Sequence, residues 1–176
     1  MFVVVTGGSG SGKSAYAEDI IVKSNIDKRY YVATMICSDE ESQKRIDRHR
    51  SMRSGKGFET LEVPVNLMQI QMEPDSAVLL ECMSNLSANE MFSSQGSQSA
   101  ESVTERIIAG IEQLKGKSRL LVVVTNEVFS DGKQYDEFTQ EYLKCLGMIN
   151  TRMAELADEV VGVVYTIPII HKKGSR

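Results

Sequence analysis

The chain has 176 residues, of which 41% are hydrophobic and 25% are charged, with a formal net charge of −4. This length and ordinary globular composition predict one domain with a proper core, spanning 1–176, and the acidic balance argues against a general nucleic-acid-binding protein. No apolar run approaches the roughly 18 residues that span a bilayer. Three widely spaced cysteines without a C-x-x-C pair (Cys37, Cys82, Cys145) predict reduced thiols in a cytoplasmic protein.

The N-terminal half alternates apolar runs with segments of helical spacing. We expect a strand at 2–5, a helix at 14–23, a strand at 30–34 and a helix at 40–52. An additional edge strand at 58–64, ended by Pro64, and a further strand at 77–80 follow. The apolar runs are continuous rather than alternating, which is typical of strands buried on both faces. Only the edge strand alternates.

The C-terminal half continues the same pattern. A polar loop at 93–99 is followed by a helix at 102–114, a strand at 120–124, a helix at 135–157 and a strand at 160–165. Ser102 with Glu105 fits a capping box, and Ser99 is a competing start. The basic end around His171 is expected to be a frayed surface tail. The whole pattern predicts a three-layer α/β fold with a mostly parallel central sheet.

Residues 7–14, GGSGSGKS, match G-x-x-x-x-G-K-[ST] between the first strand and the first helix, which is the context that this motif requires. Glycines let backbone N–H groups turn inward to form an anion nest, and the helix dipole adds positive potential. We expect Lys13 to bridge the β- and γ-phosphates and the Ser14 hydroxyl to ligate Mg²⁺. The alternative is a flexible glycine turn with a chance lysine. The motif predicts a P-loop NTPase-like domain whose nucleotide contacts come from Gly7, Gly8, Ser9, Gly10, Ser11, Gly12, Lys13 and Ser14.

Glu81 directly follows the strand predicted at 77–80. A P-loop enzyme needs an acidic group at the end of a neighbouring strand, so Glu81 is a candidate second contact for Mg²⁺. The alternative is a strand-terminal carboxylate without a metal role. The sequence has no N-K-x-D stretch of the kind that reads guanine in regulatory GTPases, which favours a metabolic enzyme.

A second motif, RIDRHRSMR at 45–53, surrounds His49 with four arginines. In a helix, positions 45, 49 and 53 stack on one face, where arginine forks can grip phosphate oxygens while the imidazole approaches phosphorus. Positive neighbours lower the pKa of His49 and a bound polyanion raises it, so the net direction stays open. The alternative is a solvated basic helix face.

Together these segments resemble the bifunctional adenosylcobinamide kinase/adenosylcobinamide-phosphate guanylyltransferase family. The resemblance runs nearly end to end through VTGGSGSGKS, YVAT, RIDRHR, ETLEVP, VLLECMSNLSANEMF, VVVTNEV and LGMINTRMAELADEVVGVVYTIPI. TNEV and LLEC are weak alone, whereas the whole set in this order and spacing is specific. After Val128 the chain departs from the Gly-Ile-Val-Pro loop and the Arg-x-Phe-Arg-Asp stretch of many members, so corrinoid contacts are not carried over from there.

The resemblance implies phosphorylation of adenosylcobinamide by ATP or GTP. Transfer of GMP from GTP through a covalent intermediate on His49 would then give adenosylcobinamide-GDP. It also implies a homo-oligomer, and a trimer in particular. The nucleotide contacts that it implies beyond the P-loop are Thr34, Met35, Ile36, Arg50, Ser51, Met52, Arg53, Glu62 and Glu81.

Two alternatives remain open from the residues. One is a small-molecule kinase in which 45–53 form a mobile arginine lid. The other is a non-catalytic nucleotide-binding module whose conformation shifts when GTP binds. Pyrophosphate release from GTP on addition of a corrinoid discriminates among them, because only a guanylyltransferase requires it.

Overall fold

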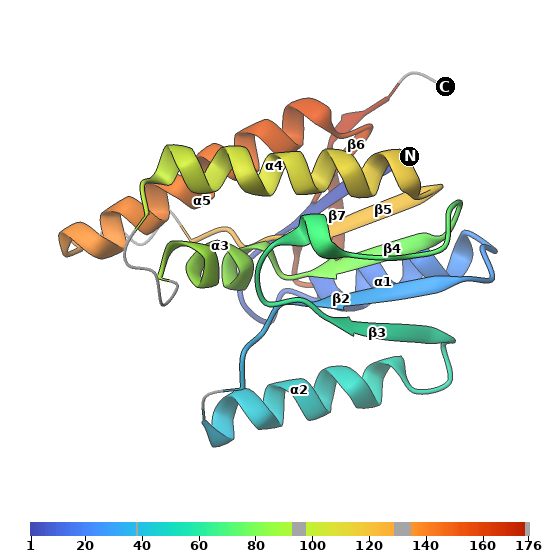
Figure 1. The fold of residues 1–176 in the computed structure, drawn as a ribbon. Coiled ribbons are helices and arrows are strands. Elements are labelled where there is room, and N and C mark those ends of the chain that lie inside the picture. The colour runs from blue at the N-terminus through green and yellow to red at the C-terminus, as the bar shows by residue number, and fades with distance from the viewer. Residues whose placement is uncertain (38, 93–97, 129–134, 175–176) are drawn as a thin grey trace.

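The computed structural model describes residues 1–37, 39–92, 98–128 and 135–174, except for the side chains of 41, 42, 45, 49 and 52 (Figure 1). Most of the predicted polar loop, 93–97, and residues 129–134 of the stretch after Glu127 lie outside the described residues. In the described part, no helix is both long enough and apolar enough to cross a bilayer.

A seven-stranded sheet organises the fold, in the order β3-β2-β4-β5-β1-β6-β7. The first six strands in the sequence run parallel, and β7 pairs antiparallel with β6. The five apolar strands and the edge strand predicted from the sequence are confirmed. Their bounds are β1 Phe2–Thr6, β2 Arg29–Ala33, β3 Phe58–Glu62, β4 Ala77–Glu81, β5 Leu120–Val124, β6 Glu159–Val164 and β7 Ile167–Lys173.

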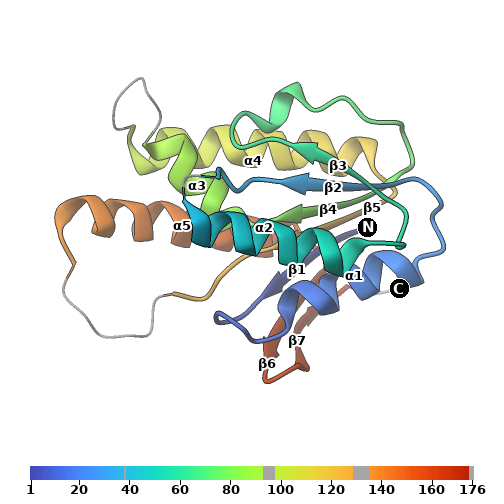
Figure 2. The same ribbon diagram turned by 90° about the horizontal axis from the view of Figure 1, so that it is seen from below.

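Helices cover both faces of this sheet, which confirms the three-layer α/β architecture (Figures 1 and 2). One face packs against α3, α4 and α5, and the other packs against α1, with α2 on the same side near the β3 edge. Consecutive β4 residues enter opposite cores, which explains the continuous apolar runs. The helices are α1 Lys13–Lys23, α2 Glu40–Arg53, α3 Met83–Met91, α4 Ala100–Lys117 and α5 Glu137–Leu156, with a 3₁₀ turn at Leu67–Gln69.

Two elements were not predicted from the sequence, and two sequence predictions were wrong. The short helix α3 and the strand β7 were not predicted, and His171 lies in β7 rather than in a frayed tail. Helix α4 begins at Ala100, because the exposed Ser99 side chain accepts the Ser102 N–H at 3.3 Å, so the competing start was the correct one. The predicted capping box at Ser102 is therefore wrong.

The parallel strands bring the sequence motifs to one edge of the sheet. Ala33 at the end of β2 is in register with Glu62 at the end of β3 and with Glu81 at the end of β4. The P-loop follows β1 at the same edge, since parallel strands share the direction of their carboxyl ends. The fold thus gathers the predicted nucleotide contacts from segments far apart in the sequence.

The α4 cap gives a stability prediction. We expect Ser99→Ala to lower the free energy of unfolding by about 1 kcal/mol, because an N–H of the first turn loses its acceptor. Ser102→Ala is the matched control and should cost less than about 0.5 kcal/mol, since only its backbone N–H is used. Urea unfolding of both variants measures the difference. Equal losses would contradict the assignment of Ser99 as the cap.

Candidate functional site

The P-loop joins β1 to α1 as the motif predicts. Gly12 precedes α1 in the left-handed region, with φ 93°, where glycine is favoured. A Cβ on Gly12 would lie 2.9 Å from Cγ2 of Thr166, and a Cβ on Gly7 would lie 2.5 Å from the carbonyl oxygen of Val163. Glycine is therefore required both for loop conformation and for close approach of the β6 end. The end of β6 and the turn that follows it therefore lie directly against the loop.

Lys13 is the first residue of α1 and is 8% exposed. Its Nζ donates a hydrogen bond to the Gly8 carbonyl oxygen at 3.0 Å, so the ammonium curls over the glycine turn. Burial lowers the pKa of Lys13, and the Cys82 and Glu81 side chains partly oppose that shift. A triphosphate in the loop would favour the charged ammonium, because it adds negative charge at short range.

Ser14 and Glu81 are directly connected. The Ser14 hydroxyl donates a hydrogen bond to Oε1 of Glu81, and the Tyr31 hydroxyl donates to Oε2 at 3.1 Å. Burial raises the pKa of Tyr31, and the Glu81 carboxylate acts in the same direction. Tyr31 thus remains a hydrogen-bond donor at neutral pH and orients the carboxylate.

This pair of oxygen groups fits Mg²⁺, which prefers carboxylate and hydroxyl ligands and keeps several waters. Among the described residues, no cluster of three or more His, Cys, Asp and Glu side chains could hold a metal ion. A Mg²⁺ at Ser14 and Glu81 would therefore take its other ligands from nucleotide phosphates and water.

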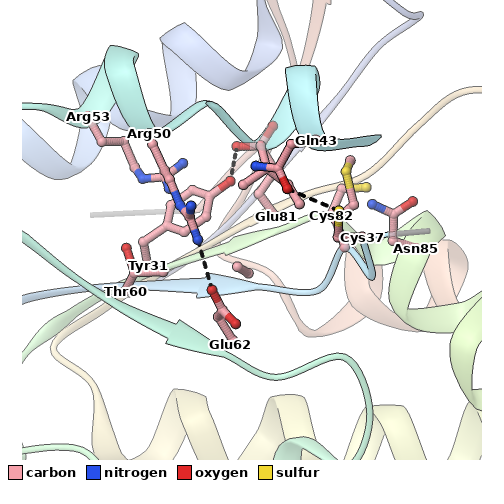
Figure 3. Close-up of a pocket in the computed structure, with 13 residues that line it drawn as sticks. Tyr31, Cys37, Gln43, Arg50, Arg53, Thr60, Glu62, Glu81, Cys82 and Asn85 are labelled. Atoms are coloured by element: carbon pink, nitrogen blue, oxygen red, sulfur yellow. Dashed lines mark hydrogen bonds and ion pairs between the residues drawn. The ribbon is translucent and has the colours of Figure 1, made fainter. Parts of the chain in front are cut away.

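A cavity of about 220 Å³ lies between α2 and the ends of β2, β3 and β4, next to Glu81 (Figure 3). An adjoining hollow of about 580 Å³ shares Arg50, Arg53 and Thr60 with it, so the combined space reaches the size of small-molecule sites. The cavity is lined by both polar and apolar side chains, namely Tyr31, Ala33, Met35, Cys37, Gln43, Ile46, Arg50, Arg53, Thr60, Glu62, Glu81, Cys82 and Asn85.

Arg53 supplies a buried positive charge to this cavity. Its side chain is 7% exposed, and its guanidinium carbon lies 3.3 Å from the centre of the Tyr31 ring. Its Nη1 has no hydrogen-bond partner among the described residues. A buried guanidinium N–H without an acceptor is costly, and a phosphate oxygen in the cavity would satisfy it. Arg53 and Tyr31 therefore link the cavity to the Glu81 carboxylate.

Arg50 lies one turn earlier on the same helix and is more exposed. Its Nη2 forms an ion pair with Oε1 of Glu62 at 3.1 Å, which ties α2 to the end of β3. Both side chains also line the cavity. Because the pair is solvent-exposed, it adds little stability and can open for a ligand.

The other predicted contacts are distributed unevenly. Met35 lines the cavity, whereas the exposed Ile36 and Ser51 are not among its lining residues. Thr34 is fully buried, and its hydroxyl both donates to and accepts from the Cys82 backbone at 2.8 Å. Its side chain therefore joins the ends of β2 and β4, and its backbone N–H and carbonyl oxygen are paired with the Glu81 carbonyl oxygen and the Asn89 side chain.

The side chains of His49 and Met52 lie outside the part that the structure describes, although both positions belong to α2. Position 49 follows Ile46 by three residues and precedes Arg53 by four. This helical spacing places it beside the face that lines the cavity.

Tyr31, Thr60 and Asn85 also line the cavity but were not among the predicted site residues. Tyr31 is two residues before Ala33, whose register partner is Glu81, so both side chains emerge on the same face of the sheet. That relation becomes visible only once β2 and β4 are known to be neighbours. Asn85 belongs to α3, a helix that was not predicted.

Comparison with known proteins gives an end-to-end match. The family model for cobinamide kinase/cobinamide phosphate guanyltransferase matches residues 3–170. The bifunctional adenosylcobalamin biosynthesis protein CobU of Salmonella typhimurium is 31% identical over 183 residues, covering 96% of this chain and 98% of that protein. The protein of the same description from Escherichia coli is 29% identical over the same coverage.

Two solved structures share the fold. An ATPase domain is similar with a TM-score of 0.56 and 11% sequence identity, covering 98% of this chain and 76% of that one. The flagellar accessory protein FlaH from Methanocaldococcus jannaschii is similar with a TM-score of 0.50 and 15% identity, covering 98% of this chain and 78% of that one. At such low identity the similarity concerns the fold alone. It agrees with the P-loop NTPase-like architecture predicted from the glycine motif.

Proposed function

The chain belongs to the cobinamide kinase/cobinamide phosphate guanyltransferase family, and we propose that both reactions use the P-loop and the cavity beneath α2. The protein is a bifunctional transferase of cobalamin biosynthesis, with adenosylcobinamide kinase and adenosylcobinamide-phosphate guanylyltransferase activities. The family match does not favour a kinase without guanylyltransferase activity or a non-catalytic GTP-binding module. The observation that carries the site proposal is the Ser14–Glu81 contact, which joins the P-loop to the cavity.

In the proposed kinase step, the γ-phosphoryl group of ATP or GTP passes to a hydroxyl of adenosylcobinamide. Lys13 neutralises charge on the β- and γ-phosphates, which is most of what a protein contributes to phosphoryl transfer. When bound by Ser14 and Glu81, Mg²⁺ supplies further neutralisation of the phosphate oxygens. Tyr31 keeps the Glu81 carboxylate oriented toward the P-loop.

In the proposed guanylyl step, a neutral ring nitrogen of His49 attacks the α-phosphorus of GTP. The bond from that phosphorus to the β-phosphate oxygen breaks, and pyrophosphate leaves. A phosphate oxygen of adenosylcobinamide phosphate then attacks the same phosphorus and displaces the histidine, which gives adenosylcobinamide-GDP. Two displacements replace one difficult step, which is covalent catalysis. Arg50, Ser51, Met52, Arg53 and Glu62 are proposed to hold the guanosine and the α-phosphate.

The two activities can be separated with labelled nucleotide. Incubation with adenosylcobinamide and GTP labelled at the γ-phosphorus should give labelled adenosylcobinamide phosphate. Of the corrinoid products, GTP labelled at the α-phosphorus should label only the GDP-activated one, with release of one pyrophosphate per product. Label transfer from the γ position without pyrophosphate release would contradict the guanylyl half.

The proposed partners are the corrinoid substrates, GTP and ATP, and further copies of this chain, with a trimer as the expected state. Three exposed isoleucines on the edge strand β7 support self-association, since such edges are otherwise protected (Ile167, Ile169, Ile170). A monomer in sedimentation analysis would contradict it. The free thiols of the three cysteines support a cytoplasmic location, which fractionation of the source cells can test.

A further inference from the structure

A second hollow adjoins the P-loop on the side away from Glu81. It has a volume of about 430 Å³, within the range of small-molecule sites. Its walls are the outer side of α1, Lys56 from the segment after α2, and the turn between β6 and β7. The residues that matter here are Gly12, Ala15, Tyr16, Asp19, Lys56 and Thr166. The hollow shares no lining residue with the cavity beneath α2.

The hollow and the Ser14–Glu81 contact lie on different sides of α1. Ser14 contacts Glu81, whereas Ala15, Asp19 and Tyr16 are turned about 100–200° around the helix axis from Ser14. Figure 2 shows α1 between α2 and the β6–β7 hairpin. The P-loop therefore has the α2 cavity at one end and this hollow at the other.

The β6–β7 turn is fixed against the P-loop. The Thr166 N–H donates a hydrogen bond to the Ser11 carbonyl oxygen at 2.8 Å, and its Cγ2 lies where a Cβ on Gly12 would clash. Tyr165 and Thr166 have φ values of 48° and 66°. Such two-residue turns normally use Asn-Gly, and a β-branched residue in the left-handed region is a genuine outlier. Thr166 thus lies beside the P-loop in a backbone conformation that threonine disfavours.

The direction of a bound triphosphate follows from the Ser14–Glu81 contact. These two residues would hold a Mg²⁺ that neutralises the terminal phosphates, so they mark the γ end. The α-phosphate and the nucleoside then extend to the opposite end of the loop, past Gly12 and Ala15. A γ-phosphoryl donor bound in this way presents its reacting phosphorus toward the α2 cavity and its nucleoside toward the hollow.

The guanylyl step requires the opposite arrangement. Its reacting α-phosphorus must lie next to α2, so the guanosine attached to it must occupy the α2 cavity. One P-loop can serve both reactions if the nucleoside lies at a different end in each.

We propose that the hollow formed by α1, Lys56 and the β6–β7 turn binds the nucleoside of the triphosphate that donates its γ-phosphoryl group. This inference rests on the proposed function, since it assigns the α2 cavity to GTP in guanylyl transfer. It adds a separate nucleoside site for the kinase step, lined by Asp19, Thr166 and Tyr16 among others.

The test uses the full chain and a matched pair of substitutions on α1. Asp19 and Lys23 form an exposed ion pair at 2.5 Å, so Asp19→Trp and Lys23→Trp break the same pair and add the same ring. Of the two, Asp19 lines the hollow. In calorimetric titration with β,γ-imido-ATP and Mg²⁺, the affinity of Asp19→Trp should be lower than that of the unchanged protein by about tenfold or more, because the ring overpacks the site. Lys23→Trp should remain within about twofold, since an exposed ion pair contributes little.

A second measurement separates the two nucleoside positions. The apparent KM for GTP can be measured from the labelling of the protein by GTP that carries its label at the α-phosphorus. In Asp19→Trp this KM should change by less than about threefold, because the substituted side chain is outside the α2 cavity. The unchanged protein, once guanylylated, should still bind β,γ-imido-ATP.

Each remaining outcome is decisive. Wild-type affinity in Asp19→Trp, equal losses in both variants, or no binding of β,γ-imido-ATP to the unchanged protein would overturn the inference. Loss of that binding upon guanylylation would also overturn it, because it means that the two nucleosides compete. Failure of the proposed function looks different, since the unchanged protein would then lack phosphoryl or guanylyl transfer altogether.

Discussion

Replacing His49 with alanine is expected to abolish the retention of α-phosphorus label by the protein after incubation with GTP. Without the ring nitrogen, no phosphoramidate can form, and overall GMP transfer should fall by about 10³-fold or more. The label on the unchanged protein should be acid-labile and base-stable, and mass spectrometry should map it to position 49. γ-Phosphoryl transfer to adenosylcobinamide should persist in His49→Ala, since that step needs no nucleophile from the protein.

The chain offers a matched control because it has two histidines. His171 lies on the exposed edge strand β7, away from the α2 cavity, and His171→Ala should retain the label at the wild-type level. Label that survives in His49→Ala but disappears in His171→Ala would assign the nucleophile to β7 instead of α2. Absence of protein-bound α label in the unchanged protein would remove the covalent route.

The parts of the site that were predictable from sequence are those with local determinants. The P-loop needs glycines, a lysine and a serine at fixed spacing, and the strand before it and the helix after it show in the same short segment. Glu81 was predictable because P-loop enzymes place an acidic group at the end of a neighbouring strand, and this carboxylate directly follows an apolar run. Its contact with Ser14 agrees with that expectation.

The stacking of Arg53 on Tyr31 could not be predicted in this way. It requires that β2 lies beside β4, that Tyr31 faces the α2 side, and that the end of α2 brings Arg53 to the Tyr31 ring. Sequence spacing indicated one arginine face built on Arg45, His49 and Arg53; among the described side chains of α2, Arg50 and Arg53 both line the cavity. The existence of α2 can be predicted from local sequence spacing, but which of its faces turns toward the sheet depends on tertiary packing.

The β6–β7 hairpin escaped prediction for a different physical reason. Its turn residues, Tyr165 and Thr166, carry none of the glycine or asparagine that normally indicates two positive φ angles. The seven residues of β7 are all exposed, so the strand lacks the alternation of buried and exposed residues from which strands are predicted. The hairpin places its turn against Ser11 and Gly12 of the P-loop.

Lys13→Ala is expected to impair both reactions, unlike His49→Ala. In the kinase step the ammonium neutralises charge on the β- and γ-phosphates. In the guanylyl step the same group stabilises the departing pyrophosphate. Loss of such a preorganised charge should reduce phosphoryl transfer to adenosylcobinamide by about 10³-fold and slow self-guanylylation as well. Single-turnover assays with γ-labelled ATP and α-labelled GTP measure the two effects separately.

Whether that loss comes from misfolding can be tested with the same variant. Lys13 is buried and its burial lowers its pKa, so its removal relieves a desolvation penalty while breaking one hydrogen bond to Gly8. We therefore expect the Tm of Lys13→Ala to equal or exceed that of the unchanged protein. Lys23→Ala, at the exposed end of the same helix, should leave both activities unchanged. Unchanged kinase activity in Lys13→Ala would contradict the P-loop assignment, and because both reactions depend on one ammonium, it would remove the shared site as well.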